Sequence, residues 1–145
     1  MISQHQKPLI SGFGQKSEPE EILANTDLSN KTVIITGGYS GIGLETTKAI
    51  KSKGAKVLIP AKRLDVAIKT LAGVIPKEDI FEMDLADLSS VKSFTDSFNE
   101  QNIPLDLLIN NAGIMACPET RINGNWESQF AVNQIGHFLF TKELM

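Results

Sequence analysis

The sequence predicts an α/β fold in which helices cover a parallel β-sheet. Short apolar runs of strand length alternate with helical segments, which is typical of parallel sheets with right-handed crossovers. A glycine-rich run at residues 36–43 separates the first apolar run from the first long helical segment. The composition, with 41% apolar and 21% charged residues, is that of an ordinary folded domain of 145 residues.

The first sixteen residues are polar and include Pro8, Gly12 and Gly14, so we expect a flexible arm at residues 1–16. Ser17 is followed three residues later by Glu20, a spacing typical of a capping box at the start of a short helix. The domain itself is therefore expected at residues 17–145.

Strands and helices are expected to alternate through the rest of the chain. The apolar runs that predict strands lie at residues 31–36, 56–59, 80–83 and 105–109. Helices are expected at residues 42–53, at 65–72, after the capping residue Asp87, and from about residue 125 to the end. We expect the strand order 3-2-1-4, the N-terminal half of a doubly wound, Rossmann-type sheet. The site should then lie where strands one and four end.

The glycine-rich run has the form of a dinucleotide-binding turn, because it joins a strand to a helix. Gly37 permits the tight turn, Gly41 lets phosphates approach the backbone, and Gly43 lets the helix pack closely on the strand. The helix N-terminus adds unpaired N–H groups and a partial positive charge. We therefore expect the cofactor diphosphate to bind here, and Ser40 in the same turn could add a hydroxyl contact to the 2′-phosphate that distinguishes NADP.

Two cations, Lys62 and Arg63, follow the second strand at the place where NAD-binding folds often carry a carboxylate. They suit the additional 2′-phosphate of NADP, so we expect NADP(H) to be favoured over NAD(H). The alternative is a pair of solvated surface charges. Asp65 is nearby, but it belongs to the following helix.

Several classes of partner are not expected. The net charge of −3 and the lack of a basic cluster give no reason to expect nucleic acid or an anionic membrane. The start of the chain lacks the apolar core of a signal peptide, and no segment is long and apolar enough to span a bilayer. Cys117 is the single cysteine, which fits a reducing, cytoplasmic location. His137 has no evident partners for a metal site.

Three motifs in order, at residues 36–43, 110–113 and 130–138, resemble those of the short-chain dehydrogenase/reductase family. The resemblance covers residues 31–145. The sequence is most similar to the subgroup of retinol dehydrogenases and WW-domain oxidoreductases and to their bacterial relatives.

This resemblance implies a set of cofactor-binding residues: Gly37, Tyr39, Ser40, Gly41, Ile42, Gly43, Lys62, Arg63, Asp84, Leu85, Asn111, Ala112 and Gly113. Asp84 would accept a hydrogen bond from the adenine amino group, and Leu85 would lie beside the ring. Asn110 would tie neighbouring strands together. Asn133 matches a catalytic asparagine that bends the last helix and holds a water in a proton relay. The alternative is a core asparagine whose side chain is satisfied by backbone groups.

The family transfers a hydride between the nicotinamide and an alcohol or carbonyl carbon, using a tyrosine and a lysine four residues later. A tyrosine needs such a cation to act near neutral pH. The single tyrosine here is Tyr39, and Gly43 stands four residues after it. We therefore expect the cofactor half of an NAD(P)-dependent oxidoreductase for a small-molecule substrate, inactive by itself.

Two structural consequences are expected from such a half domain. The fourth strand would form an exposed edge, and the last helix would expose apolar faces. The isolated chain would then be marginally stable or prone to associate, for example into a homo-oligomer. A truncated, non-catalytic nucleotide-binding or interaction module, or a non-functional gene remnant, is the alternative.

Overall fold

A four-stranded parallel sheet in the order β3-β2-β1-β4 forms the centre of the computed structural model, which describes residues 11–122 and 124–145. Val33 of β1 pairs with Val57 of β2 on one side and with Leu107 of β4 on the other. The strands are β1 (Thr32–Ile35), β2 (Lys56–Ala61), β3 (Ile80–Glu82) and β4 (Leu107–Ile109). The predicted fold class and strand order are confirmed.

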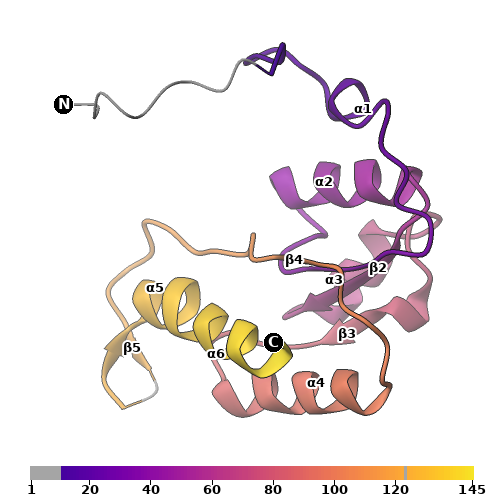
Figure 1. Ribbon diagram of the computed structural model, residues 1–145. Helices are drawn as coiled ribbons and strands as arrows, with labels where there is room; N and C mark the ends of the chain where they lie inside the picture. Colours follow the sequence, from indigo (N-terminus) through magenta and orange to yellow (C-terminus); the bar gives the residue numbers. More distant parts are fainter. Residues whose placement is uncertain (1–10, 123) are drawn as a thin grey trace, which may run out of the picture.

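Helices cover both faces of this sheet (Figure 1). The segments are α1 (Pro19–Ile22), α2 (Gly41–Ser52), α3 (Leu64–Thr70), the 3₁₀ turn η1 (Lys77–Asp79), α4 (Leu88–Glu100), α5 (Ser128–Phe130), the π-helical segment η2 (Ala131–Gly136) and α6 (His137–Leu144). Figure 1 shows α2 on one side of the sheet and α4 with α6 on the other. The chain thus forms two helix layers around one sheet.

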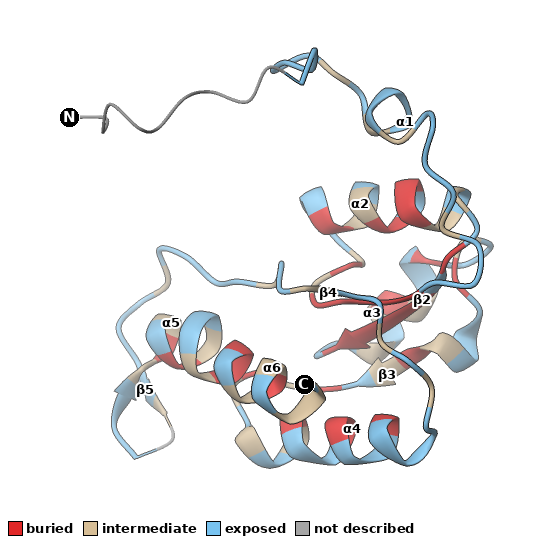
Figure 2. Cartoon of the chain, in the orientation of Figure 1, coloured by how far each residue is buried: buried red, intermediate tan, exposed pale blue. Residues whose placement is uncertain are grey.

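Strand β1 is buried on both faces, which explains its uninterrupted apolar sequence (Figure 2). Val33 and Ile35 pack with side chains of α2 and α3, whereas Ile34 between them packs with those of α4 and α6. Phe94 of α4 and Phe140 of α6 meet in this second cluster, with ring centroids 5.7 Å apart. The end of β1 is therefore held rigidly between two cores.

The prediction of a last helix from about residue 125 is wrong at its start. An antiparallel hairpin of β5 (Arg121–Ile122) and β6 (Trp126–Glu127) comes first. Asn125 has a φ of +87°, which no helix residue adopts. The Glu127 carboxylate then caps the helix by accepting the N–H groups of Gln129 and Phe130, so the helix begins at Ser128.

The predicted serine cap of the first helix is also wrong. Ser17 Oγ accepts the N–H of Gly14 at 3.0 Å and does not cap the helix. The N-cap residue is Glu18, whose side chain makes no capping bond. Pro19 supplies the start of the helix, since its fixed φ suits the first helical position. Asp87, in contrast, caps α4 as predicted by accepting the N–H of Ser89 at 2.9 Å.

The carboxylate of Asp106 connects the starts of β1 and β4. It accepts the backbone N–H of Thr32 at 2.9 Å and forms an ion pair with Lys31 at 2.7 Å. These two interactions, led by the one with Lys31, hold the pKa of Asp106 below its ordinary value of 3.8. The pairing of the two strands that frame the site is thus fixed at the end where both strands begin.

We expect Gly136→Ala to destabilise the fold, because a methyl group there would lie 2.5 Å from the backbone oxygen of Leu85. Overpacking against backbone typically costs about 1–3 kcal/mol of unfolding free energy. Urea denaturation followed by circular dichroism measures this cost. Gly14→Ala is the matched control, since no atom lies within 4 Å of its Cβ position. Equal midpoints for the two variants would contradict the packing of η2 on Leu85.

The depressed pKa of Asp106 predicts a pH dependence of stability. The unfolded chain binds the proton at higher pH than the folded chain does, so the contribution of Asp106 is present above about pH 4 and is lost as the pH falls through the folded pKa. Asp106→Asn should therefore show a shallower loss of stability on acidification below pH 4 than the wild type. Urea midpoints measured between about pH 2.5 and 6 test this expectation. Parallel curves for the two proteins would refute it.

Candidate nucleotide-binding site

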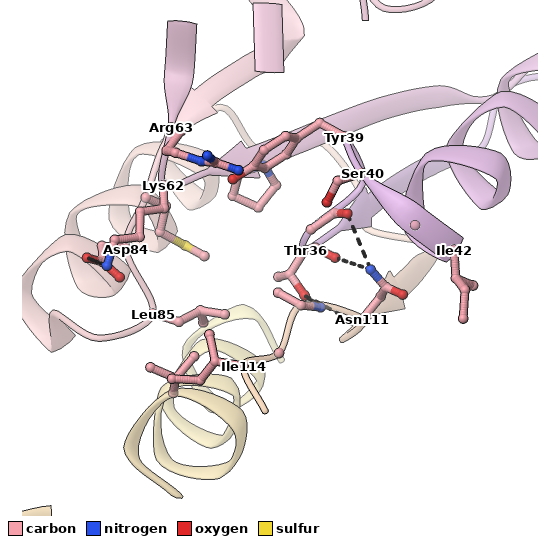
Figure 3. Close-up of a pocket in the computed structure, with 17 residues that line it drawn as sticks. Thr36, Tyr39, Ser40, Ile42, Lys62, Arg63, Asp84, Leu85, Asn111 and Ile114 are labelled. Atoms are coloured by element: carbon pink, nitrogen blue, oxygen red, sulfur yellow. Dashed lines mark hydrogen bonds and ion pairs between the residues drawn. The ribbon is translucent and has the colours of Figure 1, made fainter. Parts of the chain in front are cut away.

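A pocket of about 460 Å³ opens where the strands of the sheet end (Figure 3). Every cofactor-binding residue expected from the sequence lines it, with the exception of Gly41: Gly37, Tyr39, Ser40, Ile42, Gly43, Lys62, Arg63, Asp84, Leu85, Asn111, Ala112 and Gly113. Lining residues that the sequence did not single out are Thr36, Pro60, Met83, Ile114 and Val132. The sheet topology thus collects segments far apart in the sequence around one cavity.

The turn after β1 leaves no room for side chains on its inner side. Gly37 has a φ of +66°, and a Cβ there would lie 2.9 Å from the Cα of Ala112. A Cβ on Gly43 would collide with the carbonyl oxygen of Gly37 and with the side-chain nitrogen of Asn111. Glycine at these positions therefore lets α2, the turn and the end of β4 converge.

The N-terminus of α2 faces the same pocket. Ser40 is the N-cap residue, but its side chain makes no capping hydrogen bond within the described residues. The N–H groups of a first helical turn have no acceptor within the helix, and here no side-chain cap from Ser40 replaces one. This helix end therefore attracts anions. Gly41 has a φ of +52° and nothing within 4 Å of its Cβ position; it borders an apolar groove under α1 instead of the pocket.

Hydrogen bonds join the ends of β1 and β4 beneath the pocket. Thr36 Oγ1 accepts the backbone N–H groups of Asn111 and Ala112, both at 3.0 Å. The side-chain nitrogen of Asn111 donates back to the carbonyl oxygen of Thr36 at 3.0 Å (Figure 3). Asn111, rather than Asn110, makes the link between strands, since Asn110 donates to the Thr141 hydroxyl of α6.

The two cations expected to recognise a phosphate differ in their surroundings. Lys62 forms an ion pair with Asp84 at 2.9 Å, across the ends of β2 and β3. Arg63 makes no ion pair within the described part of the chain, and its exposed side chain extends toward Tyr39 at the pocket mouth (Figure 3). The other carboxylate oxygen of Asp84 accepts the N–H of Ala86 at 2.9 Å. Arg63 therefore carries the cationic charge that is left uncompensated.

Asn133 lies outside the pocket lining but holds the loop that lines it. Its side chain donates to the carbonyl oxygen of Ile114 at 2.8 Å and accepts the N–H of Ile114 at 2.9 Å. The residue is exposed rather than part of the core, and it sits within the π-helical segment η2. π-Helical segments are frequent at functional sites. The side chain thus pairs with both backbone groups of Ile114.

His137, one turn after Asn133, is buried and contacts Thr36. Its Nε2 lies 2.8 Å from Thr36 Oγ1, and its Nδ1 lies 3.1 Å from the carbonyl oxygen of Asn133. Burial lowers the pKa of His137 from its ordinary value of 6.5. From the sequence, His137 was considered only as a metal ligand. Its position four residues after Asn133 places both residues on one face of the helix, and this spacing could have indicated a shared structural role.

The described residues contain no cluster of three or more His, Cys, Asp or Glu side chains able to hold a metal ion. Within the same part of the chain, none of the helices has the length and apolar character needed to cross a bilayer.

Comparisons with curated proteins find relatives of known class. "Short-chain dehydrogenase TIC 32 B, chloroplastic" of Brassica napus is 41% identical over 140 residues, covering 93% of this chain and 44% of the relative. Retinol dehydrogenase 11 of Mus musculus is 36% identical, over 84% of this chain and 40% of the relative. The WW domain-containing oxidoreductase of Gallus gallus is 34% identical, over 94% and 34%. The chain thus spans less than half the length of these relatives.

Solved structures share the fold. An uncharacterised protein from Mycobacterium paratuberculosis matches with a TM-score of 0.73 and 36% identity, over 81% of this chain and 42% of that structure. An NADP complex of a short chain dehydrogenase from Burkholderia cenocepacia matches with a TM-score of 0.64 and 25% identity, over 82% and 51%. The RhlG/NADP complex of Pseudomonas aeruginosa gives 0.67 and 25%, over 81% and 48%.

The family described as short chain dehydrogenase matches residues 31–145, which is most of the chain. This match agrees with the strand order, with the glycine turn and with the relatives above. The chain belongs to the short-chain dehydrogenase family of oxidoreductases.

Proposed function

We propose that this chain binds a nicotinamide dinucleotide, with NADP(H) favoured over NAD(H), and forms the cofactor half of a dehydrogenase for a small-molecule alcohol or carbonyl substrate. The observation that carries the proposal is the position of Arg63, uncompensated within the described residues, at the mouth of the pocket that the α2 N-terminus faces. A bound dinucleotide needs one site for its diphosphate and another for its ribose phosphate. The pocket offers both, the α2 N-terminus for the diphosphate and Arg63 for the ribose phosphate.

The geometry of the glycine turn fits a diphosphate. A side chain at Gly37 or Gly43 would collide with backbone or with Asn111, so the glycines keep the turn close to the end of β4. The unpaired N–H groups of the first α2 turn can then donate to phosphate oxygens, which the helix dipole also favours. Ser40 adds a hydroxyl that no capping bond occupies.

Arg63 is the residue we assign to the 2′-phosphate of NADP. Lys62 shares its charge with Asp84 at 2.9 Å, whereas the Arg63 guanidinium can offer two parallel N–H groups to one phosphate. Lys62 then acts on the adenine end by orienting the Asp84 carboxylate that would accept the adenine amino group, with Leu85 beside the ring. Two related structures are NADP complexes, which supports the proposed preference for NADP(H).

The nicotinamide end would lie along the loop after β4. Asn111, Ala112 and Gly113 line that side of the pocket, and Asn133 holds the following residue, Ile114, by two hydrogen bonds. The cofactor supplies hydride transfer when it is bound. We assign to Asn133 the catalytic role of the family's relay asparagine, which the π-helical geometry of η2 supports.

A non-catalytic nucleotide-binding or interaction module is the second candidate. One observation favours it: several large apolar side chains are exposed. Met115 is 88% exposed, Phe138 64% and Phe130 51%, around the loop after β4 and the last helix. Such side chains favour association with another protein surface or with a second copy of the chain.

We further propose that the protein is located in a reducing compartment such as the cytoplasm and that it binds neither a membrane nor a nucleic acid. The single free cysteine, Cys117, and the weakly acidic charge of the chain support this proposal. The TIC 32 relatives of Brassica napus are named as chloroplastic, so the chloroplast is the second candidate location. Fractionation of the producing cell decides between these locations.

Arg63→Ala should weaken NADPH binding by about 10- to 100-fold, because a charge-assisted bond contributes about 1.5–3 kcal/mol. Binding of NADH, which lacks the 2′-phosphate, should change by less than about threefold. Isothermal titration calorimetry with both nucleotides measures the difference. Lys69→Ala, an exposed cation in the last turn of α3, is the matched control and should leave both affinities unchanged. Equal losses for NADPH and NADH would refute the phosphate assignment.

The 145-residue chain should bind NADPH without oxidising it in the presence of carbonyl substrates. The physical reason is that the one tyrosine, Tyr39, lies in the glycine turn and is followed four residues later by Gly43, so the tyrosine–lysine pair that serves as general acid/base in the family is not present in these 145 residues. NADPH absorbance, followed with an aldehyde and a ketone panel, tests this, and a full-length retinol dehydrogenase serves as the active control. Turnover by the 145-residue chain would contradict this expectation. If that turnover persisted in Tyr39→Phe, a residue other than Tyr39 would supply the proton.

A further inference from the structure

The loop that forms the nicotinamide side of the pocket is held at both ends. Thr36 Oγ1 accepts the N–H groups of Asn111 and Ala112 at the first end. The side chain of Asn133 binds both backbone groups of Ile114 at the other end. One buried imidazole, that of His137, contacts both holding residues, through Thr36 Oγ1 and through the carbonyl oxygen of Asn133.

The hydrogen-bonding capacity of Thr36 determines the direction of its bond to His137. A hydroxyl has one proton and two acceptor lone pairs. Both lone pairs serve the N–H groups of Asn111 and Ala112, each at 3.0 Å, so the proton must go to another acceptor. The candidates are His137 Nε2 at 2.8 Å and the carbonyl oxygen of Ile109 at 3.5 Å. The shorter distance favours the imidazole.

The other side of the ring fixes the tautomer. His137 Nδ1 lies 3.1 Å from the carbonyl oxygen of Asn133, which can only accept, so Nδ1 carries the hydrogen. Nε2 is then the bare nitrogen that accepts the Thr36 O–H. A proton on Nε2 would point at an oxygen whose lone pairs are both used. Burial, which lowers the pKa of His137, favours the same neutral form.

We propose that His137 is a positioning residue for the nucleotide pocket: as the neutral Nδ1–H tautomer it accepts the Thr36 O–H, which turns the lone pairs of Thr36 Oγ1 toward the amides of Asn111 and Ala112, and it connects this contact to the helix that carries Asn133. The effect on NADPH rests on the proposed function. The orientation of the loop does not, so the two can be tested separately.

The tautomer is tested first, without cofactor. We expect ¹⁵N NMR of the full chain near neutral pH to show a neutral His137 ring with its hydrogen on Nδ1. The chain has two histidines, so His5→Gln assigns the signals. A ring with hydrogen on Nε2, or a doubly protonated ring near neutral pH, would overturn the proposal.

Three variants then separate the two hydrogen bonds from packing. In His137→Gln the amide oxygen replaces the Nε2 acceptor, in His137→Asn the amide nitrogen replaces the Nδ1 donor, and His137→Phe keeps the ring volume alone. We expect amide hydrogen exchange at Asn111 and Ala112 to accelerate by about tenfold in the Asn and Phe variants, and to stay within about threefold of wild type in the Gln variant. Rescue by Phe instead of Gln would reduce the role of His137 to packing and overturn the proposal.

The same variants link the loop to the cofactor. If wild type binds NADPH, the Gln variant should bind within about threefold of it, and the Asn variant about tenfold more weakly. Unchanged affinity in the Asn variant would overturn the positioning role. Failure of wild type to bind NADPH would overturn the proposed function alone, and the exchange rates of Asn111 and Ala112 would then decide on His137. The Gln and Asn comparison suffices even if the Phe variant does not fold.

Discussion

The close approach of the turn after β1 to the end of β4 is the contact on which the pocket depends. Two glycines make it sterically possible, since a Cβ on Gly37 or Gly43 would overlap the neighbouring segments. Thr36 and Asn111 then fix it by hydrogen bonds in both directions. This junction places two parts of the cavity wall: the N-terminus of α2 and the loop at residues 111–114.

Features that depend on local sequence were predictable. Alternating apolar runs and helical segments gave the strand order, because parallel strands with right-handed crossovers allow few arrangements. The glycine spacing located the turn. Asp87 was predicted to cap α4, and its carboxylate accepts the N–H of Ser89 two residues away. The pocket residues followed from family motifs, and all but Gly41 line the cavity.

Features that depend on a competing local hydrogen bond or on distant contacts were not predictable from one sequence. Ser17 has the spacing of a cap, but its hydroxyl is used by Gly14, so Pro19 alone begins the helix. The ion pair of Lys62 with Asp84 arises from the pairing of β2 with β3, which places two strand ends together. The bond between Thr36 and His137 joins residues 101 positions apart, and only the folded sheet brings them into contact.

The central claim is that the diphosphate of the nucleotide lies against the glycine turn and the first turn of α2. Amide NMR of the ¹⁵N-labelled chain during NADPH titration tests this most directly, because it reports each backbone N–H separately. We predict saturable chemical-shift changes that are largest at the amides of Gly37, Ile42 and Gly43 and that extend to the loop at residues 111–114. Saturable binding with unchanged signals at these amides, or with shifts confined to the groove under α1, would contradict it.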